Sequence, residues 1–185
     1  MACIKAVAYG LNMRCGQPKQ GDLGRPLGAK VLNAADIASF TVSAASEATI
    51  TRKPAAVGYD VTTINNSMVI TVGLKSQDIM PGAFDVAITV KDFNSLNGIV
   101  SDGAPLGVSG GLTAAELVFA VDHGNGVYKV YGLGAPLICT EVSGDSSADA
   151  FATYTFGVED WQVGTTIHTM SKAAYDALST PQPAE

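Results

Sequence analysis

The feature that most constrains this chain is the alternation of apolar and polar residues along several short stretches. In AELVFAVDHGNGVYKVYG, apolar residues occupy every second position from Leu117 to Val121, and an alternation resumes from Val127 to Tyr131. A period of two places such residues on one face of a β-strand. Gly-Asn and Asn-Gly between the two runs supply the positive backbone angles that a tight turn requires. The sequence therefore predicts a β-hairpin here.

The same alternation predicts strands over 57–63, 68–75 and 84–91. The residues INNS suit a turn between the first two strands, so we expect these strands to form one hairpin rich in β-branched residues. A helix over 83–95 is the alternative to the third strand. These strands would give the chain a predominantly β character.

The C-terminal part of the chain changes character. Strands are expected at 136–142 and 150–158, joined by the polar segment SGDSSAD. After them, Thr169 or Ser171 can cap a short helix, MSKAAYDALS, which ends before Pro181. We therefore expect one short helix to follow the strands.

Together these patterns predict a mainly β fold, a β-sandwich or barrel with one or two short helices. Residues 1–27 are rich in Gly and Pro and follow neither period, so we expect an extended N-terminal arm. The predicted β-sandwich domain covers 28–168, and 169–185 form the short C-terminal helix and tail. A long Gly/Ser-rich loop is expected over 97–113.

Charge is scarce and unevenly distributed. Charged residues make up 15% of the chain, against roughly 25% in an ordinary soluble domain. Residues 1–75 carry eight bases and four acids (+4), whereas residues 76–185 carry three bases and thirteen acids (−10). Such halves can attract each other head to tail between copies. Alternatively, they fold together and neutralise each other within one molecule.

This charge placement suggests which residues carry assembly contacts. They are three bases of the arm and two acids of the SGDSSAD segment: Arg14, Lys19, Arg25, Asp145 and Asp149. Stable binding of nucleic acid is disfavoured by the formal net charge of −6, because neutralising phosphates requires a basic stripe.

The cysteines and the N-terminus indicate the compartment. Cys3, Cys15 and Cys139 are odd in number and form no C-x-x-C motif, which is typical of a protein kept in reducing cytoplasm. A single Cys3–Cys15 bridge is the alternative. MACIKAVAYG lacks the apolar core of a signal peptide, and no apolar run approaches about 18 residues, so no membrane span is expected.

Motifs for catalysis are missing from the sequence. His123 lies in the predicted turn, His168 precedes the helix, and no His/Cys cluster has zinc-ligand spacing. Patterns for a nucleophile elbow, a phosphate-binding loop and a calcium loop are also missing. Glu159 and Asp160 adjoin Trp161, but neighbouring strand residues face opposite ways and make a poor acid–base pair. The sequence predicts no enzyme, no cofactor and no metal site.

Two stretches follow a recognisable order of elements. VDHGNGVYKVYGLGAPLICTEVSGDSSADAFATYTFGVED contains a strand, an Asn-Gly turn, a strand closing on Tyr131-Gly132, a loop and a Thr/Phe-rich strand. This order resembles tail-tube proteins of bacteriophage virions. The opening MAC…GLNMRCG…KVLNAADIASFTV is similar to small Met-Ala-Cys virion proteins of phages that infect Bacteroidetes. The matching positions are Cys3, Cys15, Asn33 and Asp36.

The resemblance covers under half of the chain and implies a β-sandwich flanked by a helix. Six copies of such a protein form a ring whose inner sheets join into a continuous barrel, and rings stack through arms and loops. An acidic lumen then lets DNA pass without binding. The implied partners are further copies and neighbouring virion proteins, and the implied location is the virion, after synthesis in the host bacterial cytoplasm. The segment TTIHTMSKAAYDALST is longer than the family pattern.

Two other functions are compatible with the sequence. A capsid-decorating or auxiliary head protein would use the arm to grip a capsid lattice. A β-sandwich that binds a small ligand or carbohydrate would need an exposed aromatic cluster, for which Trp161 with Tyr154 is the candidate.

Overall fold

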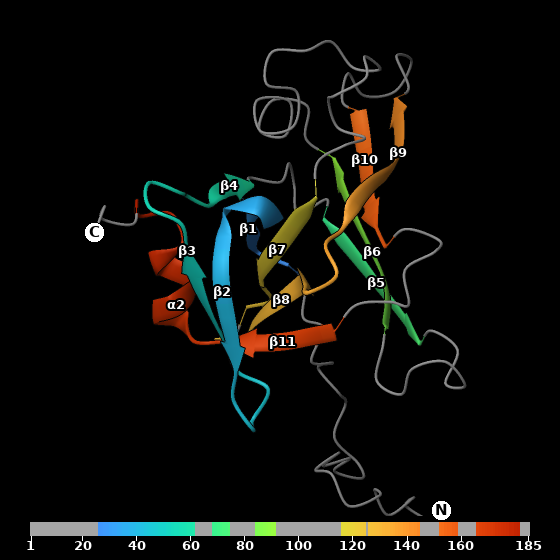
Figure 1. Ribbon diagram of the computed structural model, residues 1–185. Coiled ribbons are helices and arrows are strands. Elements are labelled where there is room, and N and C mark those ends of the chain that lie inside the picture. The colour runs from blue at the N-terminus through green and yellow to red at the C-terminus, as the bar shows by residue number, and fades with distance from the viewer. Residues whose placement is uncertain are drawn as a thin grey trace, which may run out of the picture.

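A computed structural model shows a mainly β protein built from antiparallel sheets (Figure 1). It describes residues 26–61, 68–74, 84–91, 116–124, 126–144, 152–158 and 166–181. The edge strands of the two larger sheets do not pair with each other, so both sheets are open and a sandwich forms rather than a barrel. The predicted fold class is confirmed in this form.

The larger sheet has five antiparallel strands in the order β11-β8-β7-β1-β4. Its strands are β1 (Gly28–Asn33), β4 (Tyr59–Val61), β7 (Leu117–Asp122), β8 (Tyr128–Leu133) and β11 (Thr166–Met170). The central strand β7 pairs with β1 on one side and with β8 on the other. This position explains why β7 is buried along nearly its whole length.

The second sheet has four antiparallel strands in the order β5-β6-β10-β9. Its strands are β5 (Val69–Leu74), β6 (Phe84–Lys91), β9 (Ile138–Gly144) and β10 (Ala152–Gly157). The alternation seen in the sequence is preserved here, since Val86, Ile88 and Val90 are buried while Asp85 is exposed. One face of this sheet therefore supplies core residues.

Three shorter elements accompany the sheets. They are the hairpin of β2 (Ile37–Val42) and β3 (Ala48–Arg52), the 3₁₀ turn η1 (Ala34–Asp36), and the helix α2 (Lys172–Ala177). The helix begins after Ser171, whose Oγ accepts a hydrogen bond from the Ala174 amide at 3.2 Å. Ser171, not Thr169, is thus the N-cap of this helix.

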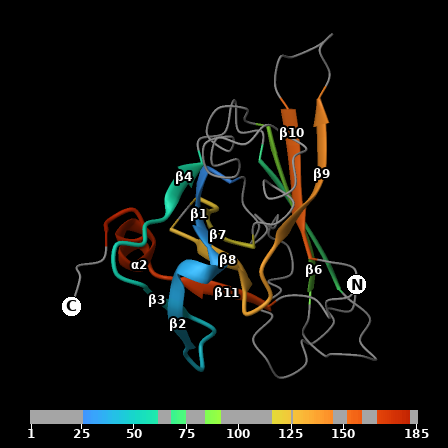
Figure 2. The ribbon, with the colours of Figure 1, turned by 45° about the horizontal axis from the view of Figure 1, so that its top comes forward.

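The five-stranded sheet is buried on both faces, which gives the molecule three layers (Figure 2). One face packs on the four-stranded sheet through residues such as Phe119 and Phe156, whose ring centroids are 5.1 Å apart. The other face packs on the β2–β3 hairpin and α2 through residues such as Val130 and Leu178. The helix and the hairpin therefore cover a second core on the side away from the four-stranded sheet.

The chain passes from one sheet to the other just after Gly132. This residue has a φ of +87°, and Leu117 and Leu137 exchange two backbone hydrogen bonds of 2.8 Å beside it. A Cβ at position 132 would lie 2.9 Å from the Leu117 carbonyl oxygen, a separation that no side chain tolerates without displacement. Only glycine suits this crossing because both the backbone angle and the available space exclude a Cβ.

Most local predictions are confirmed. The predicted hairpin at Leu117–Tyr131 exists as β7 and β8, with positive φ at Gly124 and Gly126 in its turn. Residues 84–91 form a strand and not the alternative helix. The predicted strands at 136–142 and 150–158 correspond to β9 and β10, which pair with each other.

One pairing was predicted wrongly. The segments 57–63 and 68–75 do not form a hairpin with each other, because β4 pairs with β1 in the larger sheet while β5 pairs with β6 in the other. Local alternation identified both strands but carried no information on their partners. The β11 strand extends to Met170, beyond position 168, and α2 packs on the second core.

Candidate assembly interface

The β2 strand is the most exposed strand of the described chain. It pairs with β3 alone among the described strands, and every residue from Ala38 to Val42 is exposed. Its large apolar side chains, Phe40 and Val42, are 42% and 39% exposed. An edge strand of this kind presents unpaired backbone groups and apolar side chains together.

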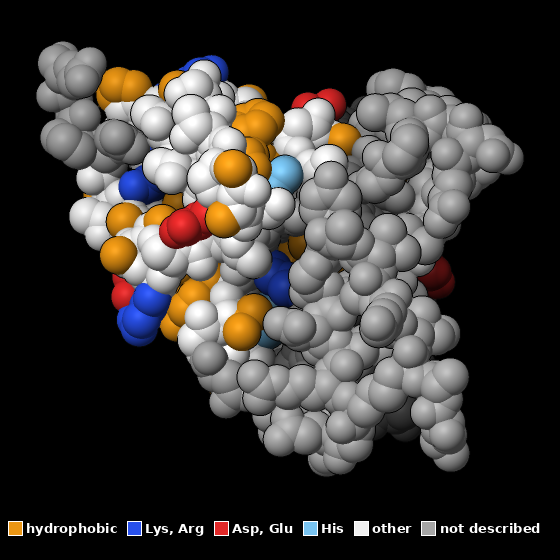
Figure 3. Space-filling view, turned by 90° about the horizontal axis from the view of Figure 1, so that it is seen from below, with side chains coloured by type: hydrophobic (Ala, Val, Ile, Leu, Met, Phe, Trp, Pro, Cys, Tyr) orange, Lys and Arg blue, Asp and Glu red, His pale blue; other side chains and the backbone are white. Residues whose placement is uncertain are grey.

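The β2 strand has little of the usual protection of such an edge. Proteins discourage edge-to-edge pairing with charged residues, proline or bulges. The stretch 37–51 has a single charged residue, Glu47, and no proline. A bulge lies between Ile37 and Ser39, at the start of the strand. Viewed from the side toward which the hairpin turn points, the described surface shows hydrophobic and uncharged polar side chains with few, separated charges (Figure 3). The exposed edge is thus suited to pairing with another chain.

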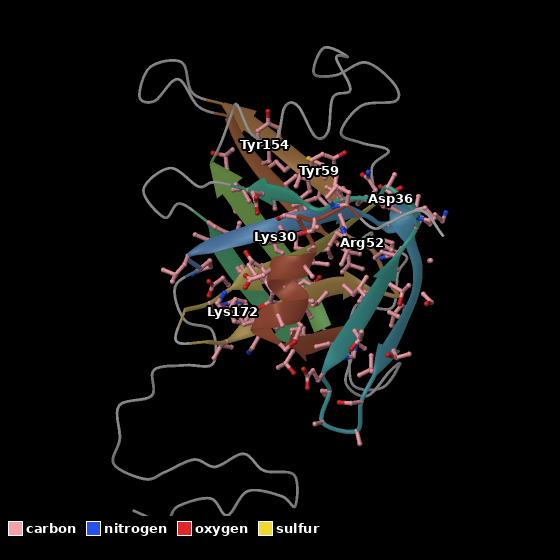
Figure 4. All side chains as sticks on the ribbon, turned by 90° about the vertical axis from the view of Figure 1, so that its left-hand side faces the viewer. Lys30, Asp36, Arg52, Tyr59, Tyr154 and Lys172 are labelled. Carbon is pink, nitrogen blue, oxygen red and sulfur yellow. The ribbon has the colours of Figure 1, made fainter. Side chains whose placement is uncertain are left out.

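Arg52 holds the hairpin firmly against α2. The Arg52 side chain is buried, and its guanidinium donates to the carbonyl oxygens of Ala56, Ala177, Leu178 and Thr180 at 2.8–2.9 Å. Burial lowers the pKa of this guanidinium from its ordinary value. Its four acceptors include carbonyls at the end of α2, where the helix has unsatisfied acceptors and a partial negative charge. This cation therefore joins the end of β3 to the C-terminus of the helix (Figure 4).

The rest of the hairpin is held at its inner strand and its turn. Ala48 of β3 is buried in the second core, and Ile50 packs against that core. At the turn, the Thr169 amide donates to the Ser46 carbonyl at 2.9 Å. The β3 strand is therefore fixed to the domain, while β2 is held in place with its outer edge exposed.

An open apolar groove of about 470 Å³ runs beside β2. None of its lining residues is charged, and Ser39 is its only polar side chain: Ala34, Ile37, Ala38, Ser39, Phe40, Val118, Gly132, Leu133, Gly134 and Pro136. A Cβ added at Gly134 would lie 3.5 Å from the Phe40 ring, so this ring lies close to the turn that follows β8. A groove of this chemistry accepts apolar side chains better than a polar ligand, because it offers few directed hydrogen bonds.

The five residues predicted for assembly, Arg14, Lys19, Arg25, Asp145 and Asp149, lie outside the described residues. The loop at 97–113 and the cysteines Cys3 and Cys15 also lie outside them. The prediction that charged residues guide assembly therefore stays a prediction.

The described histidines and the described cysteine are buried or half-buried. His123 is buried in the turn after β7, and its Nε2 lies 2.8 Å from the Tyr131 hydroxyl. The His168 Nε2 is 2.8 Å from the Thr166 hydroxyl, and burial lowers the pKa of this imidazole. Burial raises the pKa of the Cys139 thiol, which disfavours a reactive thiolate. No group of three potential metal ligands occurs within the described residues.

The aromatic pair considered for carbohydrate binding is not an exposed platform. Tyr154 is fully buried because its position on β10 faces the core between the two sheets. Trp161 lies outside the described residues. The expectation that Tyr154 forms part of an exposed aromatic surface for carbohydrate is therefore wrong.

Sequence reasoning assigned no role to β2, β3 or Arg52. The available signal was the almost uncharged stretch from 37 to 51, in which β-branched residues cluster at 41–42 and 49–51. Nothing local to Arg52 indicated its role, since three of its four carbonyl acceptors lie more than 120 residues further along the chain.

Among the described helices, none is both long and apolar enough to cross a membrane. No protein-family model, no curated protein and no solved structure matches this chain.

Proposed function

We propose that this protein is a self-assembling structural subunit of a bacteriophage virion, of the tail-tube type, whose copies form stacked rings with six subunits each. The observation that carries the self-assembly is the exposed, uncharged edge of β2. The virion and the ring arrangement come from the sequence resemblance.

The way in which β2 is held favours assembly. An edge strand binds another strand through backbone hydrogen bonds, and apolar side chains add affinity. Binding is weakened by the cost of ordering flexible segments. Here the Arg52 contacts and the Ser46–Thr169 bond already hold the hairpin, so little further ordering is needed.

The charge balance supports a conduit for DNA. A formal net charge of −6 repels phosphate, which allows passage without binding. The scarcity of charged residues is also typical of a surface that lies against other subunits. The groove beside β2 offers an apolar site in which a neighbouring subunit can place side chains.

Negative-stain electron microscopy of the purified full chain tests the proposal. We expect stacked rings or tubes with a central hole at high concentration, and six-fold symmetry within a ring. Compact trimers that never stack would instead support a capsid-decorating head protein. Monomers at every concentration in sedimentation velocity would contradict self-assembly.

A pair of matched variants tests the part played by β2. Phe40 and Tyr59 are both 42% exposed on strands at a sheet edge. We expect Phe40→Lys to abolish assembly, because it places a charge on the unprotected edge. Tyr59→Lys should leave assembly near the wild-type level, since β4 already carries the exposed Asp60. Equal effects of the two substitutions would remove β2 from the interface.

A further inference from the structure

A second strand shares the unusual properties of β2. The β5 strand is an edge of the four-stranded sheet and pairs only with β6 among the described strands. Its sequence VITVGL has no charged residue and no proline. Val69 is 57% exposed, and Thr71 and Gly73 are exposed along the same face. The β5 edge therefore lacks side-chain protection in the same way as β2.

The other edges of the described sheets carry a charge or are covered. The β4 strand contains Asp60, whose carboxylate is 3.0 Å from the Lys30 ammonium and remains exposed. The β9 strand contains the exposed Glu141. At β11, the Thr169 amide and hydroxyl both donate to the Ser46 carbonyl in the hairpin turn. The edges of β2 and β5 are thus the two that lack such protection among the described strands.

The distribution of exposed apolar side chains agrees with this distinction. Five large hydrophobic side chains are exposed in the described chain, and three of them, Phe40, Val42 and Val69, belong to β2 and β5. Each of the two strands has six residues. The hairpin lies on one side of the five-stranded sheet and the four-stranded sheet lies on the other (Figures 1 and 2).

We propose that β2 of one copy pairs with β5 of the next copy and joins their sheets head to tail. The occupant of the β2 edge is therefore a second copy of this chain. Two different surfaces on opposite sides of a subunit propagate a ring or a filament, whereas pairing of β2 with β2 would close a dimer. This inference rests on the proposed self-assembly and specifies the strands that make the contact.

Charge substitution on the two strands tests this pairing. Thr41 on β2 and Thr71 on β5 are both exposed. We expect Thr41→Lys and Thr71→Lys each to raise the concentration at which half of the protein assembles by about tenfold or more. The double variant Thr41→Lys/Thr71→Glu should recover most of the assembly, because each interface then places opposite charges on facing strands.

A matched control lies on the neighbouring strand. Thr49 on β3 is exposed and directly opposite Thr41 within the hairpin, but β3 pairs with β2 and is tied at its end to α2 through Arg52. Thr49→Lys should assemble like the wild type. Circular dichroism and urea denaturation of the dilute variants should match those of the wild type, which separates loss of assembly from loss of folding.

The other outcomes overturn the pairing in distinguishable ways. Wild-type assembly in Thr71→Lys with loss in Thr41→Lys would give the β2 edge a different occupant, such as residues 1–25. Rescue of Thr41→Lys by an equimolar Thr41→Glu copy, without rescue in the double variant, would show symmetric β2–β2 pairing. Normal assembly in all variants would refute the strand contact but leave the proposed function standing. A wild-type chain that never assembles would refute the proposed function itself.

Discussion

The strands β7 and β2 have similar composition and opposite surroundings. Both have six residues, LVFAVD and IASFTV, and both are mostly apolar. The first five residues of β7 are buried, whereas the last five of β2 are exposed. The difference arises from position, since β7 lies at the centre of a sheet covered on both faces and β2 lies at the edge of a hairpin. An apolar strand thus stabilises the fold at the first position and is available to a partner at the second.

The strongest contrast is expected from truncating one aromatic side chain in each strand. Phe119→Ala removes a fully buried ring that packs on Phe156, and we expect it to lower the free energy of unfolding by about 4 kcal/mol. Phe40→Ala should lower that free energy by only about 1 kcal/mol, because Phe40 is 42% exposed and belongs to neither core. Urea denaturation of dilute protein measures both values. Similar losses in the two variants would mean that β2 contributes to the core of the monomer.

A somewhat smaller effect is expected where the exposed hairpin joins the buried core. Arg52→Met leaves the four carbonyl acceptors of the guanidinium without this donor, and we expect a loss of about 3 kcal/mol in the free energy of unfolding. Lys53→Met is the control, since Lys53 is exposed and should cost little. Hydrogen exchange should also accelerate in α2 of the Arg52 variant. Unchanged exchange there would mean that Arg52 does not hold the helix.

The crossing between the two sheets gives a test with a lesser effect. Gly132 and Gly126 both have positive φ, but only at Gly132 would an added Cβ lie within 3 Å of a backbone oxygen. Gly126→Ala should cost about 1 kcal/mol for the backbone alone. Gly132→Ala should cost about 2 kcal/mol or more, because the Leu117 carbonyl must also move. Thermal or urea unfolding compares them, and equal losses would mean that the crossing adjusts without strain.

The weakest effect concerns pH. Burial lowers the pKa of His168 below its ordinary value of 6.5, so the unfolded chain binds a proton more readily than the folded chain. The free energy of unfolding should therefore fall as the pH is lowered through about 6.5, and should rise again toward neutral pH. His168→Gln should flatten this slope between about pH 7 and 5.5. An identical slope in the variant would assign the dependence to other groups.

The parts of the fold that were predicted correctly depend on neighbours in the sequence. The β7–β8 hairpin follows from alternation and from glycines at the turn, all within about fifteen residues. The helix α2 was predicted with two possible caps, of which Ser171 is the one used. The β4–β5 hairpin was predicted wrongly, because Val61 and Val69 enter different sheets despite their closeness in the chain. Alternation reports which face of a strand is buried and not which strand lies beside it.

The candidate interface was harder to predict than the fold. The charged residues chosen from sequence, such as Arg14 and Asp145, lie outside the described residues and remain predictions. Phe40 gave no signal of its own, because an apolar residue in an alternating stretch is normally part of a core. Its exposure depends on β2 being an outer strand of a hairpin that covers the larger sheet with its other strand.

Local sequence was enough to specify the β class of this protein, the positions of several strands, the glycine turn after β7 and the short C-terminal helix. These features arise from backbone preferences and side-chain periodicity, which act over a few residues. Long-range packing settled which sheet each strand entered, that Arg52 would hold α2, and that the edges of β2 and β5 would remain without side-chain protection. Those outcomes depend on contacts between residues far apart in the chain, and local composition does not indicate such contacts.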